Sequence, residues 1–390
     1  MHFFYKNANI CYIQLEAMLS NLYNLYLAHK HSKLTNSEFF KIYNEGLSKI
    51  TIGCSFNPEH WVFDAVSKSE QDKENITLEC AKFIIEELKI TNIRLSIRWS
   101  KVYDGKKINF SYYEKLFKYF FGQNIDICLN LGPIKTMRWP EEQVPSIVLD
   151  NLENIPAHKK VLTSQDELVS KSKEYLILLL EFVSKHFTHE ELEKISIVQA
   201  NNECFNKFGE HGWIFSPILE SEYINTIRAY FPDKKILLNS SGRNDMQRNL
   251  NLIEKTKIPS NKFILGYNYY YKVPGQADNF VLKYLDNLIL AMPLSIGTAK
   301  LIKLGQNQNF DIEVSELQGE PWMHIKSPGN SVSEFRFALI RSINSMLNLN
   351  NNESSIIRYW GIEDIVSKKM LKQETGEQSK ILELISSINQ

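Results

Sequence analysis

The chain has 390 residues, with 45 basic and 45 acidic side chains, so its formal net charge is zero. A nucleic acid or an anionic membrane usually selects for a basic excess, and the balance therefore argues against both as partners. Hydrophobic residues make up 43% and charged residues 23% of the chain, which is the composition of a globular protein with a large core.

Five cysteines are spread along the chain, and no two of them form a Cys-x-x-Cys pair. This pattern predicts neither a disulfide framework nor a zinc site, and it favours a reducing, cytoplasmic location. Residues 1–31 lack a basic start, and Glu16 and several asparagines interrupt their apolar residues. We therefore interpret this segment neither as a signal peptide nor as a membrane span. A secreted location stays open, since an atypical signal would escape this reasoning.

From residue 48 onward, short apolar runs alternate with helical patterns. Most runs are continuously apolar, which is typical of strands buried on both faces of a parallel sheet. There are eight such runs, at residues 50–55, 92–99, 125–132, 195–201, 235–240, 263–270, 310–317 and 356–361. Eight strands that alternate with helices predict an α/β fold, a single (β/α)8 TIM barrel over residues 48–390. Residues 1–47 lie outside this rhythm, and we expect them to form a helical N-terminal extension.

Several helix starts carry their own signals. Ser216 followed by Pro217 predicts an N-cap with proline at the first helical position. Three Ser-x-x-Glu patterns predict capping boxes, at residues 111–114, 164–167 and 331–334.

Polar side chains follow two strands of the predicted barrel at the point where each strand ends. In such barrels the chemistry takes place at the carboxyl ends of the strands. Asn202 and Glu203 follow the fourth apolar run, and Glu316 lies at the end of the seventh. We therefore expect the two glutamates to face each other across the barrel mouth. Such a pair fits glycoside cleavage, in which one protonated carboxyl assists the leaving oxygen and one carboxylate attacks the anomeric carbon.

Two other glutamates lie close to Glu316 in the sequence. Glu320 lies between Gly319 and Pro321, past the predicted strand, and we interpret it as a substrate-binding residue and as the alternative nucleophile. Glu313 lies inside the strand, where an unpaired inward charge would be costly. We expect its side chain to point out of the barrel toward a helix.

Several motifs resemble the clan A glycoside hydrolases, which are (β/α)8 enzymes with the acid/base after strand four and the nucleophile after strand seven. The Asn202–Glu203 pair matches the "NE" pair of this clan, and VSE at residues 314–316 matches its nucleophile pattern. GCSFNPEHW at residues 53–61 resembles the first strand of family 42 β-galactosidases. IRLSIRWSKV and LGYNYY, at residues 93–102 and 265–270, resemble the second and sixth strands of family 1.

Three further segments extend this resemblance, and one residue departs from it. RYWG at residues 358–361 is similar to strand eight of the clan, where a tryptophan lies under the sugar. GPIKTMRWPEEQVP and VSELQGEPW, at residues 132–145 and 314–322, resemble bacterial proteins that are described only as hydrolases. Cys204, in contrast, stands where the clan often has proline. We expect this difference to affect the turn that orients Glu203.

The resemblance implies a retaining O-glycoside hydrolase for β-linked sugars, with Glu203 as acid/base and Glu316 as nucleophile. Arg94 is expected to donate to Glu316, as is Tyr270, and Asn202 would bind the sugar 2-hydroxyl. An ordinary structural role stays open for each of these three residues: a barrel ion pair, core packing and a turn.

Five further side chains are predicted to contact substrate, with core packing or a structural role as the alternative for most of them: His60, Trp139, Glu320, Trp322 and Trp360. No catalytic metal and no cofactor are expected, because neither a ligand cluster nor a glycine-rich phosphate loop is found. The expected partner is a small glycoside or an oligosaccharide. Two alternatives remain for the function: a carbohydrate-binding barrel without catalysis, and a transglycosylase of the same clan.

Overall fold

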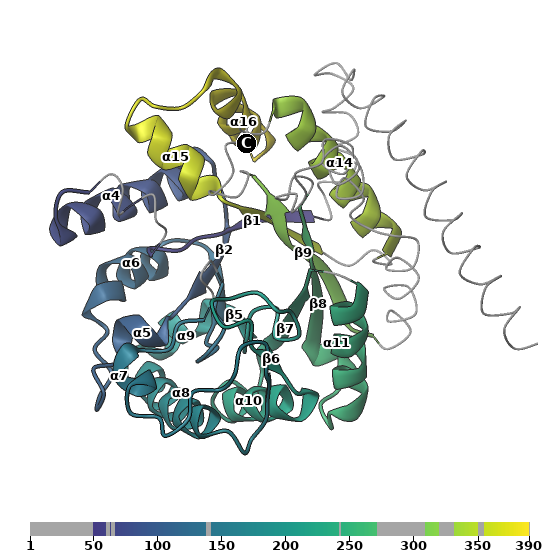
Figure 1. Ribbon diagram of the computed structural model, residues 1–390. Coiled ribbons are helices and arrows are strands. Elements are labelled where there is room, and N and C mark those ends of the chain that lie inside the picture. Colours follow the sequence, from purple (N-terminus) through teal and green to yellow (C-terminus); the bar gives the residue numbers. More distant parts are fainter. Residues whose placement is uncertain are drawn as a thin grey trace, which may run out of the picture.

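The eight barrel strands are parallel and close on themselves in the order β1-β10-β9-β8-β7-β5-β3-β2. The computed structural model describes residues 50–59, 63, 67–137, 142–241, 243–270, 309–319, 331–349 and 355–389. The strands run through the middle of the molecule and the helices surround them (Figure 1). The predicted (β/α)8 fold is therefore confirmed, whereas the predicted extension at residues 1–47 lies outside the described residues.

Each of the eight predicted apolar runs corresponds to one barrel strand, with ends that shift by up to three residues. The barrel strands are β1 (Ile50–Ser55), β2 (Asn92–Ser96), β3 (Asp126–Asn130), β5 (Ile195–Gln199), β7 (Lys235–Ser240), β8 (Phe263–Tyr269), β9 (Asp311–Gln318) and β10 (Ser355–Trp360). The sequence did not predict a small second sheet, in which β4 (Val161–Leu162) pairs with β6 (Ile214–Phe215).

Helices connect the strands on the outside of the barrel (Figure 1). They are α4 (Glu70–Lys82), which continues as the π-helix η1 (Phe83–Glu87), α5 (Trp99–Val102), α6 (Ser111–Gly122), α7 (Ser146–Leu149), α8 (Glu167–His186), α9 (His189–Glu193), α10 (Pro217–Tyr230), α11 (Arg243–Lys255), the 3-10 turn η2 (Ser260–Lys262), α14 (Val332–Leu349), α15 (Ile362–Met370) and α16 (Gly376–Ile388). Among the helices in the described ranges, none is both long enough and apolar enough to cross a bilayer.

Two predicted helix starts are confirmed. Ser331 and Glu334 form a capping box before α14, with Ser331 N donating to Glu334 Oε2 over 2.8 Å and Glu334 N donating to Ser331 Oγ over 3.2 Å. Ser216 is the N-cap of α10, and Pro217 is its first helical residue.

The other two predicted capping boxes are wrong because the serines have other roles. Helix α6 begins at Ser111 itself, whose N–H donates to Asn109 Oδ1 over 3.1 Å. The hydroxyl of Ser164 donates to Glu222 over 2.6 Å, and α8 begins only at Glu167. Neither serine is the residue directly before its helix, which is Phe110 for α6 and Asp166 for α8, so neither acts as the N-cap.

The hydrophobic core has two parts. The larger part lies between the strands and the surrounding helices. A small cluster of Cys128, Ile197, Leu237 and Ile264 lies inside the barrel, on strands paired in register. Nearer the carboxyl ends of the strands, the inward positions become polar. These inward polar residues are Ser96, Asn130, Gln199, Asn239 and Asn268. The apolar cluster therefore fills the barrel interior below the polar side chains at the carboxyl ends of the strands.

Strand β9 contains one extra residue near its carboxyl end. Val314 pairs with Tyr267 and Glu316 pairs with Asn268, so Ser315 has no partner of its own in the register. A bulge of this kind shifts the alternation of side chains by one position. As a result, side chains three residues apart on this strand share the inward face.

Glu313 therefore faces the barrel interior, and the expectation that it points outward toward a helix is wrong. It forms an ion pair with Arg358 of β10, and both side chains are fully buried. Arg358 Nε also donates to Asn92 Oδ1 of β2 over 2.9 Å. Regular alternation from Glu316 would have placed Glu313 on the outer face, and the bulge reverses this.

Removing Arg358 should destabilise the barrel strongly, because Glu313 would be left as a buried charge without its counter-ion. We expect Arg358→Met to lower the free energy of unfolding by about 3–5 kcal/mol, measured by urea denaturation. The control is Lys118→Met on α6, which breaks an exposed ion pair with Glu114 and should hardly change the unfolding midpoint. An unchanged midpoint for Arg358→Met would contradict the buried pair.

Candidate active site

Glu203 and Glu316 belong to one polar cluster at the barrel mouth. Glu316 lies on β9 and Glu203 in the turn after β5, and their exposed fractions are only 2% and 3%. Asn239 of β7 links them: its Oδ1 accepts a hydrogen bond from Glu203 N over 2.9 Å, and its Nδ2 lies 3.4 Å from Glu316 Oε1. One asparagine side chain thus contacts the segments that carry both carboxyl groups.

The carboxylate of Glu316 is held by a cation and a phenol. Arg94 Nη1 donates to Glu316 Oε1 over 2.7 Å, and the hydroxyl of Tyr270 donates to Glu316 Oε2. Arg94 is fully buried, and it also donates to Gln199 Oε1 over 2.9 Å and to Asn202 Oδ1 over 2.6 Å. The guanidinium is always charged, so it places a permanent positive charge directly beside the buried carboxyl group of Glu316.

Glu203 has a left-handed backbone conformation, with a φ of 43°. A residue with a side chain adopts this conformation only where its surroundings hold it there. Here Asn206 N donates to Glu203 O over 2.8 Å, and Phe215 N donates to Cys204 O over 2.9 Å. With the bond from Glu203 N to Asn239, these contacts fix the turn. Cys204, in place of the proline common in the clan, is buried within it.

The side chain of Glu203 contacts two amides. Asn268 Nδ2 of β8 donates to Glu203 Oε1, and Asn206 Nδ2 lies 3.4 Å from Glu203 Oε2. Asn268 and Asn239 were not among the predicted site residues. A signal for them exists in the sequence, since each is an asparagine that follows apolar residues within a buried strand.

A second group of buried polar side chains holds the segment that leads into the Asn202–Glu203 pair. Glu220 of α10 accepts hydrogen bonds from Asn201 N over 3.2 Å and from Asn201 Nδ2 over 3.0 Å. Lys135 N donates to Asn201 Oδ1 over 3.1 Å, and Lys135 O accepts from Asn202 N over 3.0 Å. Burial raises the pKa of Glu220 to about 7, although the bonds from Asn201 and the charge of Lys135 oppose this rise.

Of the five predicted substrate-contact residues, the structure describes one. Trp360 at the end of β10 is buried, and its ring centroid lies 6.4 Å from that of Tyr270, with the rings at 73°. It therefore lies beside the tyrosine that contacts Glu316. The remaining four lie outside the described residues: His60, Trp139, Glu320 and Trp322.

A further buried carboxyl group, that of Glu59, lies after β1. The hydroxyl of Tyr113 donates to Glu59, and Arg98 Nε lies 3.7 Å from it. Burial raises the pKa of Glu59, and Arg98 and Tyr113 act against this rise. In the part of the chain that the structure describes, no group of three His, Cys, Asp or Glu side chains could hold a metal ion.

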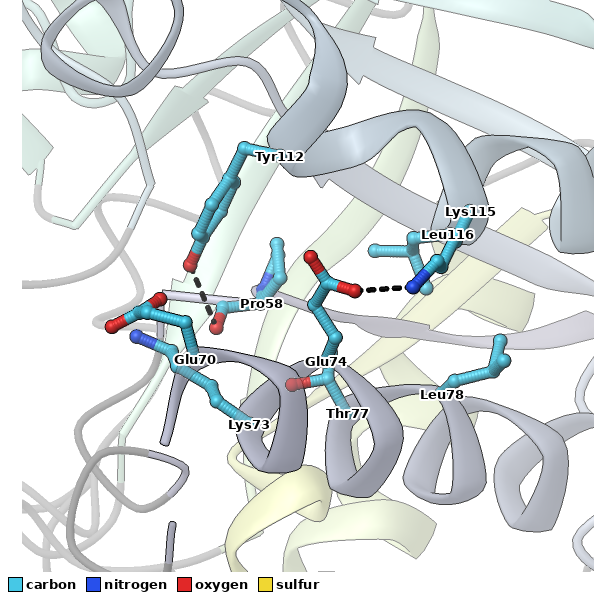
Figure 2. Close-up of a pocket in the computed structure, with 9 residues that line it drawn as sticks. All are labelled: Pro58, Glu70, Lys73, Glu74, Thr77, Leu78, Tyr112, Lys115 and Leu116. Carbon is cyan, nitrogen blue, oxygen red and sulfur yellow. Dashed lines mark hydrogen bonds and ion pairs between the residues drawn. The ribbon is translucent and has the colours of Figure 1, made fainter. Parts of the chain in front are cut away.

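A separate surface pocket of about 30 Å³ lies between α4 and α6 (Figure 2). Across it, Lys115 pairs with Glu74, and the hydroxyl of Tyr112 donates to Pro58 O over 3.4 Å. Its lining residues are Pro58, Glu70, Lys73, Glu74, Thr77, Leu78, Tyr112, Lys115 and Leu116. Since none of these belongs to the cluster around Glu316, we do not assign the pocket to the candidate site.

Comparisons with known proteins show a shared fold. No protein-family model matches the chain, and no curated protein matches it. SrfJ from Salmonella typhimurium superimposes with a TM-score of 0.50 at 13% identity, over 80% of this chain and 65% of SrfJ, so the chain spans just under two thirds of that protein.

Two xylanases are also similar in structure. Xylanase 10B from Thermotoga maritima has a TM-score of 0.49 at 12% identity, over 88% of this chain and 97% of its own. Xylanase 10B from Thermotoga petrophila RKU-1, solved with xylobiose, has a TM-score of 0.49 at 13% identity, over 91% and 98%. At these identities the likeness concerns the fold alone. The comparisons give no support to the finer resemblance to families 1 and 42, since no family model matches the chain.

Glu220 should make the stability of the protein depend on pH. Its pKa is about 7 in the folded protein, against an ordinary value of 4.5, so folding takes up a proton between these two pH values. The free energy of unfolding therefore falls as the pH rises from 4.5 to 7, by about 3 kcal/mol for this one group, and levels off above. Glu220→Gln should remove this part of the slope in urea unfolding measured between pH 4.5 and 8.

The control for this measurement is Glu222→Gln on the same helix. Glu222 is partly exposed and its pKa is lowered, because hydrogen bonds from Lys173 and Ser164 outweigh the effect of burial. It stays ionised between pH 5 and 7, so its variant should keep the wild-type slope. A Glu220→Gln variant with the same slope as the wild type would contradict the assignment.

Proposed function

We propose that this protein is a retaining glycoside hydrolase that acts on β-linked glycosides, with Glu316 as nucleophile and Glu203 as acid/base. The observation that carries the proposal is the polar cluster joined by Asn239, in which the two carboxyl groups have different partners. Glu316 lies against the permanent charge of Arg94, which suits an ionised nucleophile. Glu203 lies against the neutral amides of Asn268 and Asn206. Neutral N–H donors stabilise a carboxylate less than a full positive charge does, so Glu203 is the better suited of the two carboxyl groups to carry a proton.

In the first step, a carboxylate oxygen of Glu316 attacks the anomeric carbon and the bond to the leaving oxygen breaks. The electron pair of that bond stays on the leaving oxygen, which takes the proton of Glu203. In the second step, water attacks the same carbon, Glu203 accepts a proton from it, and the ester bond to Glu316 breaks. Two inversions at one carbon give retention of configuration.

The contacts around Asn202 support a role in binding the sugar. Its Oδ1 accepts from Arg94 over 2.6 Å and from Asn239 Nδ2 over 2.8 Å. Both donors use the same oxygen, so the amide nitrogen is the group that would donate to the sugar 2-hydroxyl. A hydrogen bond to this hydroxyl strengthens in the transition state. Trp360, beside Tyr270, would contribute a ring surface under the sugar.

A panel of nitrophenyl β-glycosides of different sugars tests the function. We expect the wild type to hydrolyse at least one of them, and Glu203→Ala to lower kcat/KM by about 10²- to 10⁴-fold for substrates with poor leaving groups. Glu316→Ala should lose several orders of magnitude for every leaving group, because no glycosyl ester can form. The matched control is Glu320→Ala, the alternative nucleophile. If it is inactive while Glu316→Ala keeps its activity, the assignment of the nucleophile is wrong.

Azide should distinguish the two roles further. With Glu203→Ala, azide replaces the second-step water and yields a glycosyl azide of retained configuration. With Glu316→Ala, azide attacks in place of the carboxylate and yields the inverted product. NMR spectra of the products measure both. Products with the same configuration from the two variants would contradict double displacement, and transfer to added sugars would favour the transglycosylase alternative.

A further inference from the structure

The amide that contacts Glu203 is itself held in place at its other end. Asn268 Nδ2 donates to Glu203 Oε1, while Asn268 Oδ1 accepts from the hydroxyl of Ser315 over 2.6 Å. All three side chains are buried. Rotating the amide by half a turn would bring oxygen against oxygen at Glu203, and a buried group that loses its partner is costly. With Glu203 ionised, the amide of Asn268 therefore has one matching partner at each end.

Ser315 reaches Asn268 because it is the bulge residue of β9. Asn268 pairs in register with Glu316, the residue after Ser315. In a regular strand, Ser315 and Glu316 would point to opposite faces of the barrel wall. The bulge lets both contribute to the mouth: Glu316 contacts Arg94, and Ser315 contacts Asn268. The residue beside the proposed nucleophile is thus connected to the proposed acid/base.

We infer that Asn268, locked by Ser315, is a positioning residue that assigns the catalytic proton of Glu203 to Oε2; this inference rests on the function proposed above. Both oxygens of Glu203 lie against an amide N–H, but the contact of Asn206 Nδ2 with Oε2 is long, at 3.4 Å, and this nitrogen also donates to Ser241 Oγ. Oε1 is therefore the oxygen that accepts the N–H of Asn268 throughout the reaction. The proton leaves from Oε2 to the leaving oxygen in the first step, and it returns to Oε2 from water in the second.

This assignment also places the leaving group. Asn206 Nδ2 lies 3.4 Å from Glu203 Oε2 and also donates to Ser241 Oγ, in the loop after β7. The leaving group must lie against the oxygen that protonates it. Its binding site is therefore on the side of the mouth formed by Asn206 and Ser241, in the segments that follow β5 and β7.

The test uses two aryl glycosides of a sugar that the wild type hydrolyses. A 2,4-dinitrophenyl group leaves with little help from an acid, whereas a phenyl group depends on it. Asn268→Ala and Asn268→Asp should each lower kcat/KM by about 10- to 100-fold for the phenyl substrate and by less than about 3-fold for the dinitrophenyl substrate. Ser315→Ala should show a smaller loss with the same preference. Asn268→Asp keeps the size of the side chain and the acceptor for Ser315, so it serves where the alanine variant fails to fold.

The matched control is Asn92→Ala, which removes another buried, inward-facing asparagine, one that binds Arg358. It should affect both substrates by the same factor. If both Asn268 variants also lose the same factor on both substrates, Asn268 has only a structural role and the inference is wrong. If the wild type hydrolyses no glycoside of the panel, or Glu203→Ala shows no dependence on the leaving group, the proposed function has failed instead.

Discussion

The buried guanidinium of Arg94 is the interaction on which the candidate site depends. A permanent charge in the barrel interior requires a counter-charge and a full set of acceptors, because an unpaired buried charge would be strongly destabilising. Glu316 supplies the counter-charge, and Gln199 and Asn202 supply further acceptors from the segment around β5. The same contacts that stabilise Arg94 therefore hold together residues from three separate parts of the chain.

Two asparagines on neighbouring strands connect this hydrogen-bond network to Glu203. Asn239 holds the backbone of the Glu203 turn, and Asn268 holds its carboxyl group. Amides suit this role because each has a donor end and an acceptor end, so one side chain can serve two partners with opposite requirements. A buried network of this kind is rigid only where every polar group in it has a hydrogen-bond partner. Gln199 donates to Asn239 Oδ1 over 2.8 Å, and Ser315 donates to Asn268 Oδ1. These two residues therefore satisfy the acceptor ends of both amides.

The inward side chains of the barrel form two layers, a lower one that stabilises the fold and an upper one that contains the candidate site. Below lies an ion pair between Glu313 and Arg358, and the small apolar cluster around Leu237 fills the space inside the strands. Above, the inward side chains are polar, and Arg94 and Asn239 contact Glu316 there. The backbone strain at Glu203 lies at the edge of this polar layer, where the turn after β5 is held by β6 through Cys204 and by β7 through Asn239.

The sequence by itself determined the eight strands, because continuously apolar runs bounded by loops are a local pattern and burial on both faces requires it. It also determined that Glu203 and Glu316 lie at strand ends, because position along a strand is local too.

Only the tertiary structure decided which side chains face inward and which partners they bind. A single bulge at Ser315 turned Glu313 inward against regular alternation, and no local pattern marks that bulge. Asn239 and Asn268 could be seen in the sequence as asparagines in buried strands, but their partners are 36 to 77 residues away in the chain. Hydrogen bonds between residues so far apart are set by the closure of the barrel.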